Sequence, residues 1–126
     1  MKKVISIIDD DPSVREGMMD LLRSMDFDVE AFELAADFLH SNRLCGTSCL
    51  IADVQMPKMT GLELCDHLIG LGNIIPTILI TAFPNARDEA WAQRARVTCY
   101  LPKPFTEAQL LDCIHKALEQ RNIVGR

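Results

Sequence analysis

Five polar side chains stand at the ends of short apolar runs in this chain. They are two adjacent carboxylates, a third carboxylate, a hydroxyl and an ammonium group: Asp9, Asp10, Asp53, Thr81 and Lys103. Three carboxylates in one crevice repel each other, and a hard divalent cation such as Mg²⁺ is the natural partner that offsets them. Aspartate is a known type of covalent nucleophile, and the other groups stabilise charge on transferring oxygens. Together these residues suit phosphoryl transfer onto the carboxylate of Asp53.

The apolar runs that carry these residues have the length and composition of buried strands. Residues 4–8, 49–53 and 77–81 are almost continuously apolar, and turn-forming residues follow them. Runs of this kind predict strands that are buried on both faces. Residues 29–32 alternate apolar and polar side chains, and residues 98–101 form a short run before a proline. We therefore expect these two segments to be edge strands.

Apolar residues at helical spacing fill the segments between these strands. The expected helices lie in five segments: residues 12–25, 34–40, 60–70, 85–95 and 106–119. Four of the helices begin at a residue whose side chain can cap free backbone N–H groups: Asp11, Thr60, Asn85 and Thr106. Gln109 completes a capping box with Thr106, which strengthens the prediction of the last helix.

Five strands that alternate with five helices predict an α/β fold with one parallel sheet covered on both faces. The three most apolar strands should be central, and right-handed crossovers then favour the strand order 2-1-3-4-5. This order reverses direction between the first and third strands, where open α/β sheets bind their ligands. Asp9 and Asp10 should therefore meet Asp53 at this crevice.

Length and composition predict a single globular domain. The chain has 126 residues, of which 48% are hydrophobic, and a net charge of −5. We expect one domain over residues 1–126, with residues 121–126 as a frayed tail or the start of a linker. The sequence has no basic patch, so we expect no direct binding to nucleic acid. No apolar run approaches the roughly 18 residues of a membrane span, and we expect a cytoplasmic protein without membrane contact.

The cysteines are odd in number and include no CxxC pair: Cys45, Cys49, Cys65, Cys99 and Cys113. In a cytosolic protein such residues are most simply small buried hydrophobic side chains. A zinc site can be drawn from the middle of the chain: His40, Cys45, Cys49, Cys65 and His67. Its spacings match no standard zinc pattern, and one of its cysteines lies in an expected strand, so we do not favour it.

Each of the five polar residues has a simpler explanation when it is taken alone. An aspartate after a strand is often a turn former or a helix cap, which is the role we assign to Asp11. A single lysine is usually solvated, and Thr81 alone is an ordinary strand-end hydroxyl. Their joint occurrence at four correctly ordered strand ends favours a chemical site over these explanations.

With these motifs in place, the chain resembles a receiver domain of bacterial two-component response regulators, which has a flavodoxin-like fold, over essentially its whole length. Four segments carry the resemblance: Ile8-Asp9-Asp10-Asp11, Asp53-Val54-Gln55-Met56-Pro57 with Gly61, Ile80-Thr81-Ala82, and Tyr100-Leu101-Pro102-Lys103-Pro104-Phe105. Each segment is weak evidence alone, but their order and spacing are highly specific. The loops after residues 81 and 101 are also similar to those of receivers that carry a helix-turn-helix output domain.

The resemblance implies a role for each residue of the site. Asp53 would accept a phosphoryl group from a histidine kinase or a phosphotransfer protein. Asp9, Asp10, Asp53 and the backbone carbonyl of Gln55 would hold Mg²⁺ or Mn²⁺. Lys103 would bind the phosphoryl oxygens. The peptide bond between Lys103 and Pro104 would be cis.

The resemblance also implies a switch that catalyses only its own phosphoryl transfer and autodephosphorylation. Thr81 would move to the phosphoryl group, and Tyr100 would turn inward behind it. The readout face would comprise the fourth helix, the fifth strand and the fifth helix, and would control a partner, a homodimer or an output domain. Trp91 lies on the fourth helix and is either a core residue or part of this partner surface.

Some positions depart from the family pattern. Arg96 stands where relatives commonly have a glycine that ends the fourth helix, so we expect that helix to end differently. Thr60 replaces a frequent aspartate, although both residues can cap a helix. Gln55 and Phe83 occupy variable positions beside the site, where we expect them to tune the lifetime of the phosphoryl group.

Two other functions fit the same fold. One is a protein-interaction module that does not use phosphorylation, and the intact set of site residues argues against it. The other is a small phosphatase or another flavodoxin-like enzyme. The chain offers no second acid or base beyond the aspartates and no deep substrate segment, so we favour the signalling switch.

Overall fold

The computed structural model describes residues 2–124, and the side chains of residues 121–124 lie outside that description. In this part of the chain, strands and helices alternate without exception. The elements are β1 Val4–Ile8, α1 Pro12–Ser24, β2 Asp28–Phe32, α2 Ala35–Leu39, β3 Cys49–Asp53, α3 Gly61–Gly70, β4 Thr77–Thr81, α4 Ala86–Arg94, β5 Cys99–Pro102 and α5 Glu107–Val124. None of these helices is long and apolar enough to cross a membrane.

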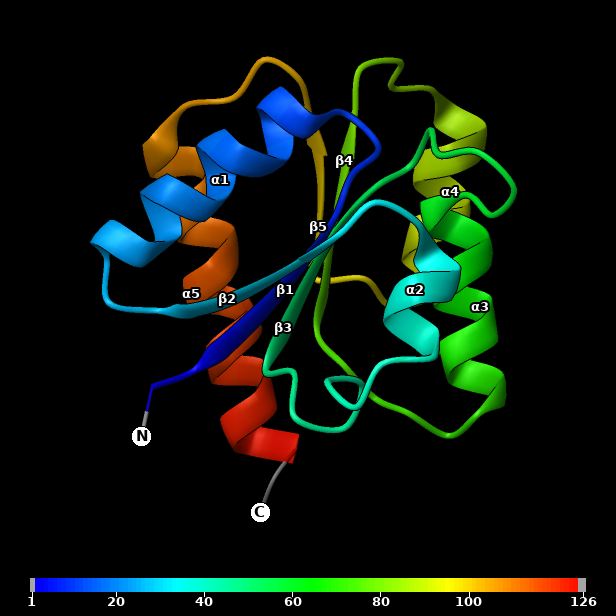
Figure 1. The fold of residues 1–126 in the computed structure, drawn as a ribbon. Helices are drawn as coiled ribbons and strands as arrows, with labels where there is room; N and C mark the ends of the chain where they lie inside the picture. Colours follow the sequence, from blue (N-terminus) through cyan, green and yellow to red (C-terminus); the bar gives the residue numbers. More distant parts are fainter. Residues whose placement is uncertain (1, 125–126) are drawn as a thin grey trace.

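The strands form one parallel sheet in the order β2-β1-β3-β4-β5 (Figure 1), which confirms the predicted topology. β3 and β4 are buried along their whole length, and β1 is buried except at its first residue. β2 and β5 are only partly buried, as their position at the edges requires. The parallel arrangement sends the carboxyl ends of all five strands to one edge of the molecule, at the top of Figure 1.

Helices cover both faces of the sheet (Figure 1). α1 and α5 pack on one face, and α2, α3 and α4 pack on the other. β3 shows how the sequence produces two cores, because its side chains alternate between the faces. Cys49 and Ile51 join the core under α1 and α5, whereas Leu50 and Ala52 join the other. Burying a large aliphatic side chain of this kind contributes roughly 1.5–3 kcal/mol to the free energy of unfolding.

The helices begin where the sequence predicts. Asp11 caps α1, because its Oδ1 accepts a hydrogen bond from the backbone N–H of Ser13 at 2.9 Å. Asn85 caps α4 in the same way. Thr60 begins α3 with a capping box, and the expected box of Thr106 and Gln109 is present at 3.1 and 2.8 Å. Such caps each contribute about 1 kcal/mol to helix stability.

Three helices end in a Schellman motif, in which the residue after the cap adopts a left-handed backbone conformation. That residue is Asp26 after α1, Gly72 after α3 and Arg96 after α4, with φ values of 68°, 76° and 58°. The expectation that α4 ends differently without a glycine is therefore wrong. The backbone hydrogen bonds of the motif hold Arg96 in a conformation that glycine adopts more easily.

Two further expectations differ from the structure. Cys45 is exposed and Cys99 is half-buried, whereas the other three cysteines are buried as expected. Cys45 lies in the irregular segment after α2, and such connections run over the protein surface. α5 continues as a helix to Val124, past Gln120, where the sequence predicts fraying. Residues 125–126 of the predicted tail lie outside the described residues.

Replacement of Arg96 by glycine should stabilise the protein, because it removes the cost of the left-handed conformation. We expect Arg96→Gly to raise the free energy of unfolding by about 1 kcal/mol, measured by urea denaturation. The reciprocal change, Gly72→Ala, should lower it by a similar amount. Equal stability of Arg96→Gly and the unchanged protein would contradict the argument.

Candidate functional site

The predicted site residues gather at the carboxyl edge of the sheet. Asp9 follows β1, Asp53 is the last residue of β3, Thr81 ends β4, and Lys103 follows β5. Asp9, Asp53 and Thr81 are buried, and Lys103 is half-buried. Asp10 is exposed, and it forms no hydrogen bond or ion pair within the described residues. The sheet therefore brings four of the five side chains into direct or close proximity and leaves Asp10 at the rim.

The carboxylate of Asp53 is held at both oxygens. Oδ2 accepts a hydrogen bond from Nζ of Lys103 at 2.7 Å, which is also an ion pair. Oδ1 accepts a hydrogen bond from the backbone N–H of Gln55 at 2.8 Å. Burial of a carboxylate is costly unless such partners compensate it. These contacts fix the orientation of the Asp53 carboxylate at the end of β3.

Asp9 is less completely satisfied than Asp53. Oδ1 accepts a hydrogen bond from the backbone N–H of Asp11 at 2.9 Å, but the buried Oδ2 has no hydrogen-bond partner among the described residues. Nζ of Lys103 lies 3.7 Å from this oxygen. Burial raises the pKa of the Asp9 carboxyl, and the Asp11 N–H and the charge of Lys103 offset that effect in part. Oδ2 of Asp9 is thus a buried acceptor without a donor among the described residues, and it faces Lys103.

Lys103 is the cation between the two buried carboxylates. Its backbone N–H donates to the carbonyl of Thr81 at 2.7 Å, and its bond to Pro104 is cis, as predicted. Partial burial works to lower the pKa of the ammonium group, but the hydrogen bond and charge of Asp53, with the charge of Asp9, outweigh it. The pKa is therefore raised, and the side chain stays protonated at neutral pH.

Thr81 and Gln55 form a contact that the sequence did not predict. The hydroxyl of Thr81 donates to Oε1 of Gln55 at 3.0 Å and accepts from the backbone N–H of Phe83 at 3.0 Å. The sequence predicts a metal-ligand role for the backbone carbonyl of Gln55 and an influence on phosphoryl lifetime, but no contact with Thr81. The structure adds that its side chain holds the Thr81 hydroxyl.

Two residues expected in the response lie near α4. Tyr100 is half-buried, and its hydroxyl accepts a hydrogen bond from the backbone N–H of Asn85, the cap of α4, at 3.3 Å. Trp91 is half-buried against the core, and its Nε1 donates to Asp66 of α3 at 3.0 Å. Both rings therefore connect α4 to its neighbours. The assignment of Trp91 to a partner surface remains a prediction.

Arg15 and Gly61 position the site without being part of the predicted set. Nη1 of Arg15 donates to the backbone carbonyl of Asp9 at 2.7 Å, which fixes the end of β1. Gly61 begins α3 directly against the end of β3. A Cβ atom on Gly61 would lie 2.6 Å from the carbonyl oxygen of Asp53, which is too close for any side chain. Glycine is therefore required here by close approach rather than by an unusual φ.

The donor set fits a hard divalent cation. Asp9 contributes a buried oxygen without a hydrogen bond, and Asp53 and the exposed Asp10 contribute further carboxylate oxygens. Among the described residues, no three acidic, histidine or cysteine side chains are already arranged to hold a metal. This arrangement suits Mg²⁺, because Mg²⁺ keeps several waters and usually takes only one or two protein carboxylates. We therefore regard the residues as compatible with Mg²⁺ or Mn²⁺.

Comparison with known proteins agrees with this geometry. A family model described as the response regulator receiver domain matches residues 5–115. The chain is 39% identical to the response regulator protein TodT of Pseudomonas putida over 116 residues, which cover 92% of the chain and 51% of TodT. It is 35% identical to the transcriptional regulatory protein TdiR of Thauera aromatica, with 90% of the chain and 50% of TdiR covered. The chain thus spans about half the length of these relatives.

Solved structures show the same similarity. The response regulator StyR has a TM-score of 0.84 and 39% identity, over 97% of this chain and 62% of StyR. The structure titled FixJ-N has a TM-score of 0.84 and 28% identity, over 94% of this chain and 95% of that one.

Substitution of Gly61 by alanine should disturb the position of Asp53. The added Cβ would clash with the Asp53 carbonyl, which is backbone and cannot move aside without shifting β3 or α3. We expect Gly61→Ala to lower the free energy of unfolding by about 2 kcal/mol, measured by urea denaturation. The matched control is Gly17→Ala within α1, where no atom other than those of the glycine, its chain neighbours and the helix's own backbone lies within 4 Å of the new Cβ. That control should be neutral or stabilising, and equal losses in both variants would refute the argument.

Substitution of Asp9 by asparagine should stabilise the metal-free protein. Asparagine resembles the protonated carboxyl, and the raised pKa of Asp9 means that the folded state favours that form. Stability should therefore increase as pH falls through the folded-state pKa, and Asp9→Asn should reproduce part of that gain at neutral pH. We expect a gain of about 1 kcal/mol in the free energy of unfolding without Mg²⁺. Asp10→Asn, at an exposed carboxylate, serves as the control and should change stability little.

Proposed function

Because the chain belongs to the response regulator receiver domain family, we propose that it is a signalling switch whose phosphoacceptor is Asp53. The observation that carries the proposal is the contact of the buried Asp53 carboxylate with Lys103 at 2.7 Å, beside Asp9. A charged nucleophile, a cation for the transferring oxygens and a hydroxyl for the product lie at one edge of the sheet.

The chemical step is transfer of a phosphoryl group from a phosphohistidine. A carboxylate oxygen of Asp53 attacks phosphorus, the P–N bond to the imidazole breaks, and its electron pair remains on the leaving nitrogen. The product is an acyl phosphate on Asp53. Lys103, which contacts Asp53 Oδ2 in the resting state, then binds an oxygen of the phosphoryl group, where negative charge has accumulated.

Asp9, Asp10, Asp53 and the backbone carbonyl of Gln55 would hold Mg²⁺ or Mn²⁺ in this proposal. The metal would supply positive charge beside the phosphoryl oxygens during transfer. The residues of the chain prepare the site for it. Arg15 fixes the backbone of Asp9 at 2.7 Å, and Gln55 N–H orients the Asp53 carboxylate at 2.8 Å.

Thr81 and Tyr100 would convert phosphorylation into a change of shape. A phosphoryl group adds strong acceptor oxygens. Thr81 would leave the Oε1 of Gln55, which it contacts at 3.0 Å, and donate to the phosphoryl group instead. Tyr100 would then turn inward and break its hydrogen bond to the cap of α4 at Asn85. The α4/β5/α5 face, including Trp91, would carry the change to a partner.

The partners follow from the family and from the relatives. TdiR is named a transcriptional regulatory protein, and it is about twice as long as the matched region. We propose that this chain acts in the cytoplasm and that a cognate histidine kinase or phosphotransfer protein supplies the phosphoryl group. We further propose that the α4/β5/α5 face controls an output domain or a homodimer, and that this output regulates transcription.

Phosphorylation by a small donor tests the assignment of Asp53. The protein incubated with acetyl phosphate and Mg²⁺ should gain the mass of one phosphoryl group, measured by intact mass spectrometry. Asp53→Asn should abolish the gain, and chelation of the metal should slow it strongly. Asp37→Asn, at an exposed aspartate on α2, is the matched control and should be phosphorylated normally.

The same experiment separates the competing functions. An absence of mass gain, or a gain that survives Asp53→Asn, would contradict the proposal and favour a module that does not use phosphorylation. Sustained turnover of unrelated phosphate esters would favour a phosphatase.

Trp91 provides a readout of the proposed movement of α4. Phosphorylation should change the fluorescence of Trp91, because this residue of α4 donates a hydrogen bond to Asp66 of α3 and a movement of α4 would alter that contact. Thr81→Val keeps the shape of the side chain but removes the hydroxyl, so it should be phosphorylated without the full fluorescence change. Thr77→Val, at the other end of β4, is the matched control and should retain the change. Identical fluorescence responses in the two variants would exclude Thr81 as the coupling residue.

A further inference from the structure

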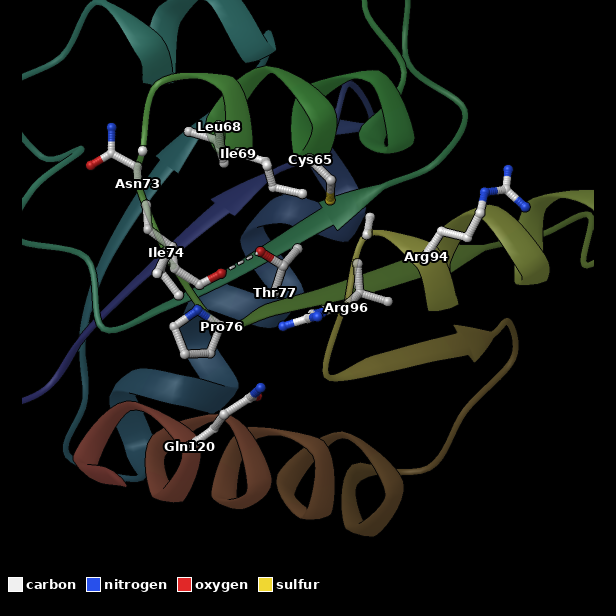
Figure 2. Close-up of a pocket in the computed structure, with 14 residues that line it drawn as sticks. Cys65, Leu68, Ile69, Asn73, Ile74, Pro76, Thr77, Arg94, Arg96 and Gln120 are labelled. Carbon is white, nitrogen blue, oxygen red and sulfur yellow. Dashed lines mark hydrogen bonds between the residues drawn. The ribbon is translucent and has the colours of Figure 1, made fainter. Parts of the chain in front are cut away.

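A cavity lies at the end of the sheet opposite Asp53, and none of the residues discussed at the phosphoryl site lines it. Figure 2 shows its lining residues. We call it the α3–α4 pocket, and its volume is about 760 Å³. The carboxyl ends of α3 and α4 and the segment before β4 form it, with Gln120 of α5 at one side. Its principal lining residues are Cys65, Leu68, Ile74, Pro76, Arg94 and Arg96.

The interior of the α3–α4 pocket is apolar and incompletely covered. Cys65 and Leu68 are buried beneath it, and burial raises the pKa of the Cys65 thiol to about 12. At the rim, Ile69 is 56% exposed and Ile74 is 73% exposed. Exposure of large aliphatic side chains around a concave surface is unfavourable in water, and such patches often mark binding sites. Binding of an apolar ligand would be favourable, because it would remove this apolar surface from water.

The polar part of the pocket is cationic. Arg94 and Arg96 line it, and neither forms an ion pair or a hydrogen bond through its side chain with another described residue. No acidic residue lines the pocket, although the chain has a net charge of −5. Figure 2 shows the side chain of Arg96 turned toward Pro76 across the pocket. An anionic group in the pocket would find the unpaired guanidinium group of Arg96 beside an apolar surface.

The backbone conformation of Arg96 lowers the stability of the folded protein. The residue holds a φ of 58°, a conformation in which arginine is less stable than glycine. An adjoining hollow of about 390 Å³ shares Ile69, Arg94 and Ala95 with the pocket and adds Asp66, Arg87 and Trp91. Arg96 is therefore the arginine that faces the apolar surface of the α3–α4 pocket.

We propose that the α3–α4 pocket binds a small amphipathic anion, of the class of medium-chain carboxylates. The alkyl chain lies on Leu68 and Ile74, and the carboxylate pairs with Arg96. The volume lies within the range of roughly 300–1,000 Å³ that is typical of small-ligand sites. The proposal concerns a site separate from Asp53 and does not depend on phosphorylation.

Titration with decanoate tests the proposal. Decanoate added to ¹⁵N-labelled protein should shift the backbone amide signals of the pocket residues in a saturable manner, with a dissociation constant on the order of 0.1–1 mM. Decanol has the same chain length without the charge and should bind about fivefold more weakly. Equal affinity for decanol, shifts spread over the whole surface, or no saturable shift would overturn the proposal.

Variants of the chain locate the site. Arg96→Gly removes the charge and relieves the backbone, so it should fold and still bind decanoate about fivefold more weakly. Arg96→Gln removes the charge without relieving the backbone, and it should also weaken binding. Arg23→Gln is the matched control, because this exposed arginine on α1 lies outside the pocket, and it should leave the affinity unchanged. Unchanged affinity in both Arg96 variants would exclude Arg96 as the anion site.

The oligomeric state provides a second check on the occupant. Ile74→Ser should weaken decanoate binding without changing the sedimentation coefficient of the protein. A dimer that this substitution dissociates would show instead that a second copy of the chain covers the pocket, and would overturn the proposal.

Discussion

The site depends on one cation between two buried carboxylates. Lys103 Nζ lies 2.7 Å from Asp53 Oδ2 and 3.7 Å from Asp9 Oδ2. Without that charge, two buried carboxylates would face each other across a region of low dielectric, where repulsion is strong. The Asp9 carboxylate is the less well compensated of the two, because its Oδ2 has no hydrogen-bond partner among the described residues. The two carboxylates can therefore still bind a further cation. Lys103 can also move its hydrogen bond from Asp53 to a phosphoryl group.

The fold produces this arrangement through the direction of its strands. Parallel strands place their carboxyl ends at one edge, and the order β2-β1-β3-β4-β5 puts the ends of β1 and β3 side by side. Close packing then fixes the details. Gly61 allows α3 to begin against the carbonyl of Asp53, and Arg15 ties down the carbonyl of Asp9. At the opposite end of the sheet, the carboxyl ends of α3 and α4 and the segment before β4 line the α3–α4 pocket.

Sequence alone was sufficient for the features that depend on local pattern. Apolar runs predicted the buried strands, and their different polarity predicted the strand order and the meeting of Asp9 with Asp53. Side-chain contacts that the strand order does not dictate were not accessible. The contact between the side chains of Gln55 and Thr81 joins residues 26 positions apart, and no periodicity signals it. The left-handed conformation of Arg96 was missed for a related reason, because the hydrogen bonds of the helix end overrode the residue's own preference.

A double-mutant cycle on Asp9 and Lys103 tests most directly whether Lys103 offsets the buried carboxylates. The free energy of unfolding would be measured at neutral pH, without metal, for Asp9→Asn, Lys103→Gln, the double variant and the unchanged protein. The account predicts that Lys103→Gln destabilises the protein strongly when Asp9 is present and much less when it is asparagine, with a coupling energy above about 1 kcal/mol. Additive effects of the two substitutions would contradict it.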